Sequence, residues 1–362
     1  MPAMTQIPQN YKNNVNWILG AYTDAGVNFP NGFQKDAIQN AVGARKTDKW
    51  KNWSCDISFI ENEHGRFVVV EDCGTVGLTG KNTPSEEINK MMAQEKTLPS
   101  TERLSRFTSM FNSGGNTTGG GLFGAGKSVY SVASSTYTYY FDSLREDGKY
   151  VANINKCGQV MTVALEEDAA KKYIFERTGL QSKKTNGTRV IIEEPKEELV
   201  TSIQSGEIIP FIQESWWLII QRFDETSCIS VNGVPVTVPQ GIKTGTRTFE
   251  LQTPETYATD YKVKHFGLYL FENGDNIWEG VSYYRKGMKI GEIDLKDIPA
   301  RIEGKFWGYI EVDKLWEDAL SDIEDKVHFG VSKGQKRTTT YQYLKNYCND
   351  KIRANLVEWG FI

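Results

Sequence analysis

A glycine-rich run in the first half of the chain sets the strongest constraint on how the protein can fold. Five glycines fall within the eight residues 119–126, and small and apolar residues then recur at helical spacing from Lys127 to Ser134. Glycine lets backbone N–H groups approach an anion closely, and the positive end of a following helix stabilises negative charge. The run therefore predicts a phosphate-binding loop that opens a helix.

Two kinds of phosphate loop fit these residues. Gly121 to Ser128 match the P-loop pattern G-x-x-x-x-G-K-[S/T], which requires a buried strand just before its first glycine. Residues 111–118 are instead polar and glycine-rich and show no strand pattern. The second alternative is a glycine-rich lid, G-x-x-G-x-G, formed by Gly121 to Gly126 and running directly into a helix. The loop alone does not decide between the two, so the flanking segments must.

The composition is that of a globular chain. Its 362 residues are enough for two domains of ordinary size, and a hydrophobic fraction of 39% predicts a buried core. The five cysteines form no C-x-x-C pair, and three histidines are few for a catalytic metal cage. The formal net charge of −4 argues against general attraction to nucleic acid, although a local basic patch stays open. Without a signal-peptide core or an apolar run of about 18 residues, we expect a cytoplasmic protein with no membrane partner.

A helix is predicted over residues 33–46, where apolar residues recur at helical spacing. Asp36 and Asn40 are four residues apart in this segment, so both side chains leave the same flank. A carboxylate can take a proton from water, and an amide oxygen can hold a magnesium ion. Taken alone, this helix fits an ordinary solvated face better than a catalytic one.

A strand is predicted over residues 66–70, and Asp72, Gly74 and Gly77 follow it. An aspartate at a strand end beside two glycines predicts a buried carboxylate next to closely approaching backbone. An ordinary strand-to-loop turn is the alternative. Later strands are predicted to form an antiparallel sheet covered by helices on one face, and they lie at 136–142, 150–155, 159–165 and 189–193.

Four short motifs therefore follow one another along the chain: Asp36-x-x-x-Asn40, Asp72-x-Gly74-x-x-Gly77, the lid at 121–126, and Gly187-Thr188 before a strand. In order and spacing they resemble the GHKL ATPase family, which includes gyrase-type topoisomerases, heat-shock chaperones, histidine kinases and MutL. The lid is most similar to the gyrase type. The resemblance implies an α+β chain in which a GHKL (Bergerat) α/β sandwich over residues 1–199 binds ATP and a transducer-like α/β domain over residues 200–362 follows.

The resemblance also implies roles for individual residues. Asp72 would accept a hydrogen bond from the adenine amino group, supported by Thr188, while Gly74 and Gly77 let the base and sugar approach the backbone. Asn40 would coordinate Mg²⁺ on the ATP phosphates. The N–H groups of Gly124, Gly126 and Lys127 would contact the phosphates. The whole ATP-binding lid would comprise Gly121, Leu122, Phe123, Gly124, Ala125, Gly126, Lys127 and Ser128.

Asp36 is then the residue expected to orient or deprotonate the attacking water. The family usually has glutamate here, and aspartate is one methylene shorter, so turnover is expected to be slow or to need a shift of the helix. Many members also carry an aspartate three residues after the asparagine, where this chain has Gly43. That difference affects the expected metal and ribose contacts and leaves the adenine pocket unchanged.

The second half begins after a polar break, which places the predicted boundary near residue 200. An amphipathic helix is expected over 208–223 and a hairpin at Asn232-Gly233. Transducer domains commonly send a lysine to the ATP γ-phosphate, and Lys333 and Lys336 lie in a late basic loop that suits this role. A solvated basic loop is the alternative.

The function implied is an ATP-operated clamp, in which ATP closes the lid, two subunits associate and hydrolysis reopens them. An ATP-sensing module with little turnover, acting on a separate effector protein or DNA, is the second hypothesis. A P-loop phosphotransferase is the third. For the N-terminal residues 1–20, a loosely packed arm and a strap exchanged between subunits are both open.

Overall fold

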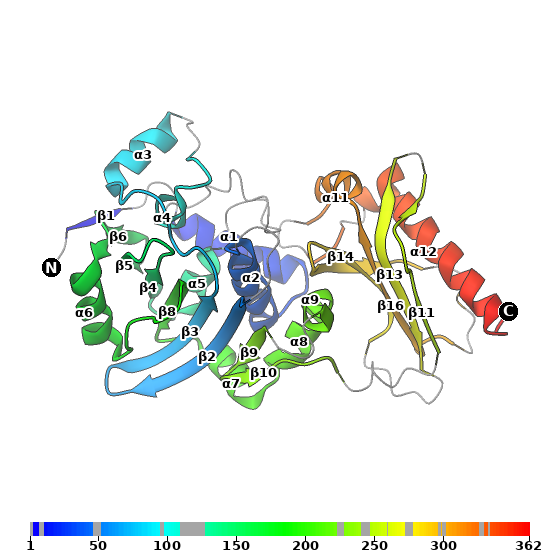
Figure 1. The fold of residues 1–362 in the computed structure, drawn as a ribbon, viewed down its shortest axis with the longest axis horizontal. Coiled ribbons are helices and arrows are strands. Elements are labelled where there is room, and N and C mark those ends of the chain that lie inside the picture. The colour runs from blue at the N-terminus through cyan, green and yellow to red at the C-terminus, as the bar shows by residue number, and fades with distance from the viewer. Residues whose placement is uncertain are drawn as a thin grey trace. The chain divides into compact units, whose positions relative to one another are not determined.

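The computed structural model describes residues 3–6, 11–45, 52–94, 98–108, 127–222, 228–239, 247–258, 260–271, 278–295, 298, 302–325, 329–331 and 334–362. The chain divides into two compact units (Figure 1). The first comprises Met1–Ile212 and Glu225–Val236, and the second comprises Gln213–Asp224 and Thr237–Ile362. Among the described helices, none is both long and apolar enough to cross a lipid bilayer.

One large mixed sheet forms the centre of the first unit. Its described strands lie in the order β1-β6-β5-β4-β8-β3-β2-β9-β10, with β7 beside β5. Only the β2–β9 pair among them is parallel. The strands are β1 Met4–Gln6, β2 Ser54–Asn62, β3 Gly65–Cys73, β4 Thr138–Leu144, β5 Tyr150–Lys156, β6 Gln159–Met161, β7 Leu165–Glu166, β8 Gly187–Glu193, β9 Ile229–Val231 and β10 Val234–Pro235.

The described helices of this part of the chain are α1 Tyr11–Asp24, α2 Phe29–Gly43, α3 Ser85–Ala93, α4 Arg103–Thr108, α5 Ser128–Ala133, α6 Glu167–Thr178 and α7 Glu197–Ser205. Helix α2 starts four residues before the predicted start, because Asn28 caps it by accepting from the Asn31 N–H and Pro30 occupies its first turn. The single helix predicted over 208–223 is instead two helices, α8 Ile208–Ser215 and α9 Trp217–Arg222.

One face of the first sheet packs against α6. Ala170 and Ile174 of this helix belong to a buried cluster with residues of β3, β4, β5, β6 and β8. From β3 the cluster takes Phe67 and Val69, which are two residues apart and so point to the same face. This face therefore carries its own apolar core.

The opposite face packs against α4 and α5. The ring of Tyr130 on α5 lies 5.8 Å from that of Tyr139, and Phe107 on α4 lies 4.8 Å from Phe141. Tyr139 and Phe141 flank Tyr140, which belongs to the α6 cluster, so they point to the other side of the sheet. Helices thus cover both faces.

The prediction that helices cover a single face is therefore wrong. The apolar run of β3 is continuous from Phe67 to Val70, and all four side chains are buried. Continuous runs of this kind are typical of strands whose two faces are both covered, whereas a one-sided strand alternates apolar and polar residues.

The second unit holds a mixed sheet in the order β11-β13-β16-β14-β15, with β12 beside β13. Helix α11 begins after Asp313, whose carboxylate accepts from the Trp316 N–H. The α+β class predicted from the sequence is confirmed. Besides α9, the described elements of this unit are β11 Arg247–Glu250, β12 Glu255–Thr256, β13 Lys262–Leu270, β14 Gly280–Arg285, β15 Met288–Ile293, β16 Phe306–Val312, α11 Lys314–Ser321, the 3-10 helix η1 Gln335–Arg337 and α12 Thr339–Glu358.

Candidate functional site

Asp72 lies near the end of β3, buried on the sheet face that α4 and α5 cover. The Thr75 hydroxyl donates to its Oδ1 at 2.6 Å, and the Thr188 backbone N–H donates to the same oxygen at 3.0 Å. No group among the described residues donates to Oδ2. Burial raises the pKa of the Asp72 carboxyl, and the Lys183 ammonium and these two hydrogen bonds oppose that rise.

The glycines that follow Asp72 are required by the chain's own packing. Gly74 has φ of +72° and Gly77 has φ of +69°, which side chains rarely adopt. A Cβ on Gly74 would collide with the carbonyl group of Asn52, and one on Gly77 would lie 2.7 Å from Ser143 Oγ. Their expected contacts with a base and a sugar stay predictions.

Thr188 contacts Asp72 through its main chain, while its hydroxyl lies 3.4 Å from Ser143 Oγ. The side-chain hydrogen bond to Asp72 comes from Thr75, which the sequence interpretation missed. A threonine a few residues after an aspartate at a strand end fits a turn closed by the hydroxyl, so this spacing could have predicted the contact.

Asp36 is buried on α2 and accepts a hydrogen bond from the hydroxyl of Tyr22 on α1. The Tyr22 ring packs directly on Gly32, so that a Cβ added to Gly32 would lie only 2.7 Å from the ring. Burial and the Asp36 carboxylate raise the pKa of Tyr22 well above its usual value, so the hydroxyl keeps its proton and remains a donor. The residue expected to act on water is therefore already held by a buried partner.

We expect Gly32→Ala to destabilise the protein by about 1–3 kcal/mol, since its Cβ would displace the Tyr22 ring. Gly20→Ala on α1 is the matched control, because no heavy atom lies within 4 Å of its added Cβ. That control should be neutral or stabilising by up to about 1 kcal/mol through helix propensity. Urea unfolding followed by tryptophan fluorescence compares the two variants, and equal stabilities would contradict the packing of Tyr22 on Gly32.

Asn40 is half-buried one turn after Asp36, and its amide nitrogen donates to the Tyr130 hydroxyl at 3.2 Å. This contact leaves the amide oxygen, to which no described residue donates, as a ligand suited to a hard cation. Gln39 is also buried on α2, and its Nε2 has no hydrogen-bond partner among the described residues. No three acidic, histidine or cysteine residues of the described part gather into a metal site.

Tyr130 links the first two motifs. Its hydroxyl receives the hydrogen bond from Asn40, and its electrostatic environment includes the Asp72 carboxylate. Burial raises the pKa of Tyr130, and the Asn40 hydrogen bond opposes that rise. The structure thus brings Asn40, Tyr130, Asp72 and Thr188 into one region of a single sheet face.

The lid lies mostly outside the described residues, which do not include Gly121, Leu122, Phe123, Gly124, Ala125 and Gly126. The structure places Lys127 directly before α5 and Ser128 buried at its first position. The Lys127 ammonium donates to the carbonyl oxygen of Arg106. Burial, aided by the Arg106 charge, lowers the pKa of Lys127 to about 7.

Two arginines on α4 add positive charge here, and the sequence interpretation missed both. Arg103 lies close enough to Asp72 for their charges to interact. Burial lowers the pKa of both Arg103 and Arg106, and the charge of Arg103 adds to the effect on Arg106. Arginines are common where proteins bind phosphate groups, because the guanidinium fork matches phosphate oxygens.

Lys336 lies in the second unit, where its ammonium pairs with Asp294 at 2.8 Å. This ion pair gives it a partner within its own unit. The other candidate for the γ-phosphate, Lys333, is outside the described residues. The assignment of a phosphate-sensing lysine stays a prediction.

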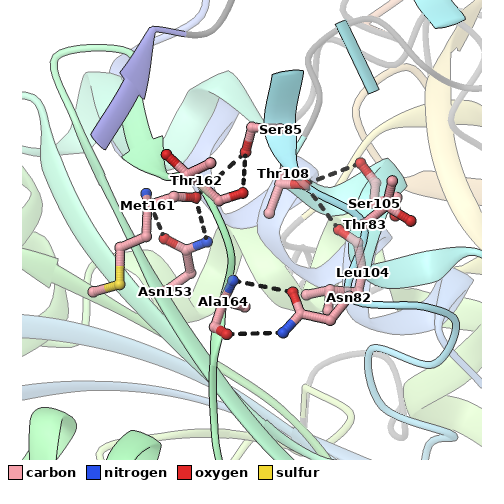
Figure 2. Close-up of a pocket in the computed structure, with 10 residues that line it drawn as sticks. All are labelled: Asn82, Thr83, Ser85, Leu104, Ser105, Thr108, Asn153, Met161, Thr162 and Ala164. Carbon is pink, nitrogen blue, oxygen red and sulfur yellow. Dashed lines mark hydrogen bonds between the residues drawn. The ribbon is translucent and has the colours of Figure 1, made fainter. Parts of the chain in front are cut away.

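A small polar pocket lies beside α4, and most of its polar side chains hydrogen-bond to main-chain atoms (Figure 2). The Asn82 side chain exchanges hydrogen bonds of 2.8 and 3.0 Å with the backbone of Ala164. Asn153 does the same with Met161, at 3.3 and 2.9 Å. These amides join neighbouring segments, so we assign no ligand to the pocket, which is lined by Asn82, Thr83, Ser85, Leu104, Ser105, Thr108, Asn153, Met161, Thr162 and Ala164.

Comparison with known proteins adds no family to this description. No protein-family model matches the chain, and a search of curated proteins found no match. The resemblance to GHKL ATPases therefore rests on the four sequence motifs alone.

Proposed function

We propose that the protein binds ATP with Mg²⁺ in a GHKL-type site and hydrolyses it, so that lid closure and subunit association follow the nucleotide. In this proposal the first unit is a Bergerat-type ATP-binding domain whose sheet carries helices on both faces, and the second is a transducer-like domain. The observation that carries the proposal is the Asp72 carboxylate. Its Oδ1 is held by two donors and its Oδ2 by none of the described residues, at a buried strand end.

A buried acceptor of this kind suits the adenine amino group. Adenine offers an N–H donor at this position, whereas guanine offers a carbonyl oxygen that a carboxylate would repel. A site that relies on a buried hydrogen bond discriminates strongly against a ligand that cannot form it. Asp72 therefore accounts for a preference for ATP over GTP.

The residues of α2 fit the phosphate end of the same nucleotide. Asn40 offers an amide oxygen for Mg²⁺. Asp36, one turn away, would accept a proton from the attacking water. Bound Mg²⁺ supplies charge neutralisation of the phosphates.

The P-loop alternative is disfavoured by the sheet. In P-loop proteins the helix after the loop connects parallel strands. Here β4 follows α5 and is antiparallel to both of its neighbours, β5 and β8. The match of Gly121 to Ser128 to the P-loop pattern is therefore better explained as a coincidence.

An ATP-sensing module with little turnover is the second candidate function. The Tyr22 hydroxyl already occupies one oxygen of Asp36, whose side chain is shorter than the glutamate of the family. Both features favour slow hydrolysis. Under this alternative, nucleotide binding changes the affinity for an effector protein or DNA.

Calorimetric titration with a non-hydrolysable ATP analogue and its GTP counterpart, both with Mg²⁺, tests the proposal. We expect the ATP analogue to bind at least about 100-fold more tightly, a difference of about 2.7 kcal/mol. Light scattering with and without the ATP analogue then measures the expected dimerisation. Equal affinities for the two analogues would contradict the site, and binding without measurable phosphate release would favour the sensing module.

A further inference from the structure

The segment between α6 and β8, residues 179–186, contacts the backbone at Asp72 and the two residues that follow it. Lys183 in this segment is fully buried, with 0% of its side chain exposed. Its ammonium pairs with the Glu71 carboxylate and donates to the main-chain oxygen of Asp72 at 3.0 Å. A buried lysine with both of these partners fixes the strand at the residue that the proposed function uses.

Neighbouring residues of the segment hold the next two positions. The Asn186 carbonyl accepts from the Gly74 N–H at 2.9 Å, and the Thr185 hydroxyl lies 3.0 Å from Cys73 Sγ. Gly187 follows, where a Cβ would collide with the main-chain oxygen of Asp72. The segment 183–188 therefore contacts three consecutive residues, 72–74, and this close approach fixes their path.

Lys183 also dominates the charges that favour the ionised form of Asp72. The other charged or titratable groups around this carboxyl are Glu71 on β3, Arg103 on α4, Cys55 on β2 and Tyr130 on α5. Burial raises the pKa of Asp72, and Glu71 adds to this rise. Lys183 lowers the pKa of Asp72 and so opposes both effects. Loss of the lysine charge would therefore extend the protonated form of Asp72 to higher pH.

We propose that Lys183 is a positioning residue for adenine recognition, which holds the main chain of Asp72 in place and brings a positive charge to the surroundings of its carboxylate. This inference rests on the proposed function. Lys183 does not contact the nucleotide in this proposal, and it acts through Asp72 alone. The sequence interpretation missed it because its two partners are more than a hundred residues away.

Calorimetric titration with the non-hydrolysable ATP analogue between pH 5 and pH 8 tests this role in the full chain. We expect Lys183→Met to bind about tenfold more weakly at pH 7, as for the loss of one charge-assisted interaction. The pH below which affinity falls should rise by about one unit or more, because the neighbouring cation no longer lowers the pKa of Asp72. Lys184→Met is the matched control, since this adjacent lysine is exposed, and it should behave like the parent.

The pH profile separates positioning from simple support of the fold, which would lower affinity without moving the profile. If Lys183→Met does not fold, Lys183→Gln carries the same test, because it removes the charge and keeps a donor. The inference is overturned if the folded variant matches Lys184→Met in affinity and pH profile while Asp72→Asn has lost binding. If Asp72→Asn binds the analogue like the parent, the proposed function fails instead.

Discussion

Asp72→Asn is expected to weaken binding of a non-hydrolysable ATP analogue by about 100-fold or more. Thr75 and Thr188 both donate to Oδ1, so they will hold the amide oxygen of the variant in that position. The amide nitrogen then takes the place of Oδ2 and faces the adenine amino group. Two donors meet in a buried site, and neither is satisfied. Calorimetric titration at pH 7 measures the loss.

Asp56→Asn is the matched control for this substitution. Asp56 lies on the neighbouring strand β2, where its carboxylate accepts from the Ser230 hydroxyl and from the Gly233 N–H at 3.0 Å. An asparagine there removes the same charge and can still accept through its oxygen. We expect parental affinity for this variant.

Asp72→Asn should also reduce discrimination between adenine and guanine. An amide donor at the Oδ2 position can meet the carbonyl oxygen of guanine, which the carboxylate repels. The ratio of affinities for the ATP and GTP analogues should therefore fall toward one, a result that a general loss of folding would not give. An unchanged affinity for the ATP analogue would show that the adenine group lies elsewhere.

Asp36→Ala is expected to lower phosphate release by at least about 100-fold while the affinity for the ATP analogue stays within about threefold. The carboxylate is the group expected to accept a proton from water, and it makes no contact with the base in this proposal. Measuring phosphate release and calorimetric binding on the same preparation separates the two effects. Thermal unfolding checks that the buried Tyr22 hydroxyl, which loses its acceptor, has not unfolded the variant.

Tyr22→Phe is the control for Asp36→Ala, because it removes the hydrogen-bond donor and keeps the carboxylate. Phosphate release by this variant should stay well above that of Asp36→Ala. If the parent protein already releases phosphate no faster than Asp36→Ala, the clamp hypothesis fails and the ATP-sensing module takes its place.

The sequence predicted those parts of the fold whose signals are local. The β-branched run before Asp72 predicted β3, and the same run, being continuous, also carried the sign of a strand covered on both faces. Apolar spacing alone placed the start of α2 too late. Asn28 and Pro30 indicate the correct start, because they are typical of a helix N-terminus.

The contacts that surround the candidate site depend on the tertiary fold and could not be predicted. Tyr22 reaches Asp36 only because two successive helices pack against each other, with a glycine at the point of contact. Lys183 contacts Asp72 only because the segment before β8 packs against β3, which is distant in the chain. No periodicity or short motif predicts such pairs. The contact of Thr75 with Asp72 is local, and the three-residue spacing between them could have predicted it.

The parallel pairing of β2 with β9 has a practical consequence for producing the first unit by itself. Cys55 and Ile57 on β2 are aligned with Ile229 and Val231, and all four are buried. A fragment cut at residue 199 would lack that neighbour and would present an uncovered apolar strand edge, which invites aggregation. A truncation intended for crystallisation should therefore keep the chain through Val236, where the first unit ends.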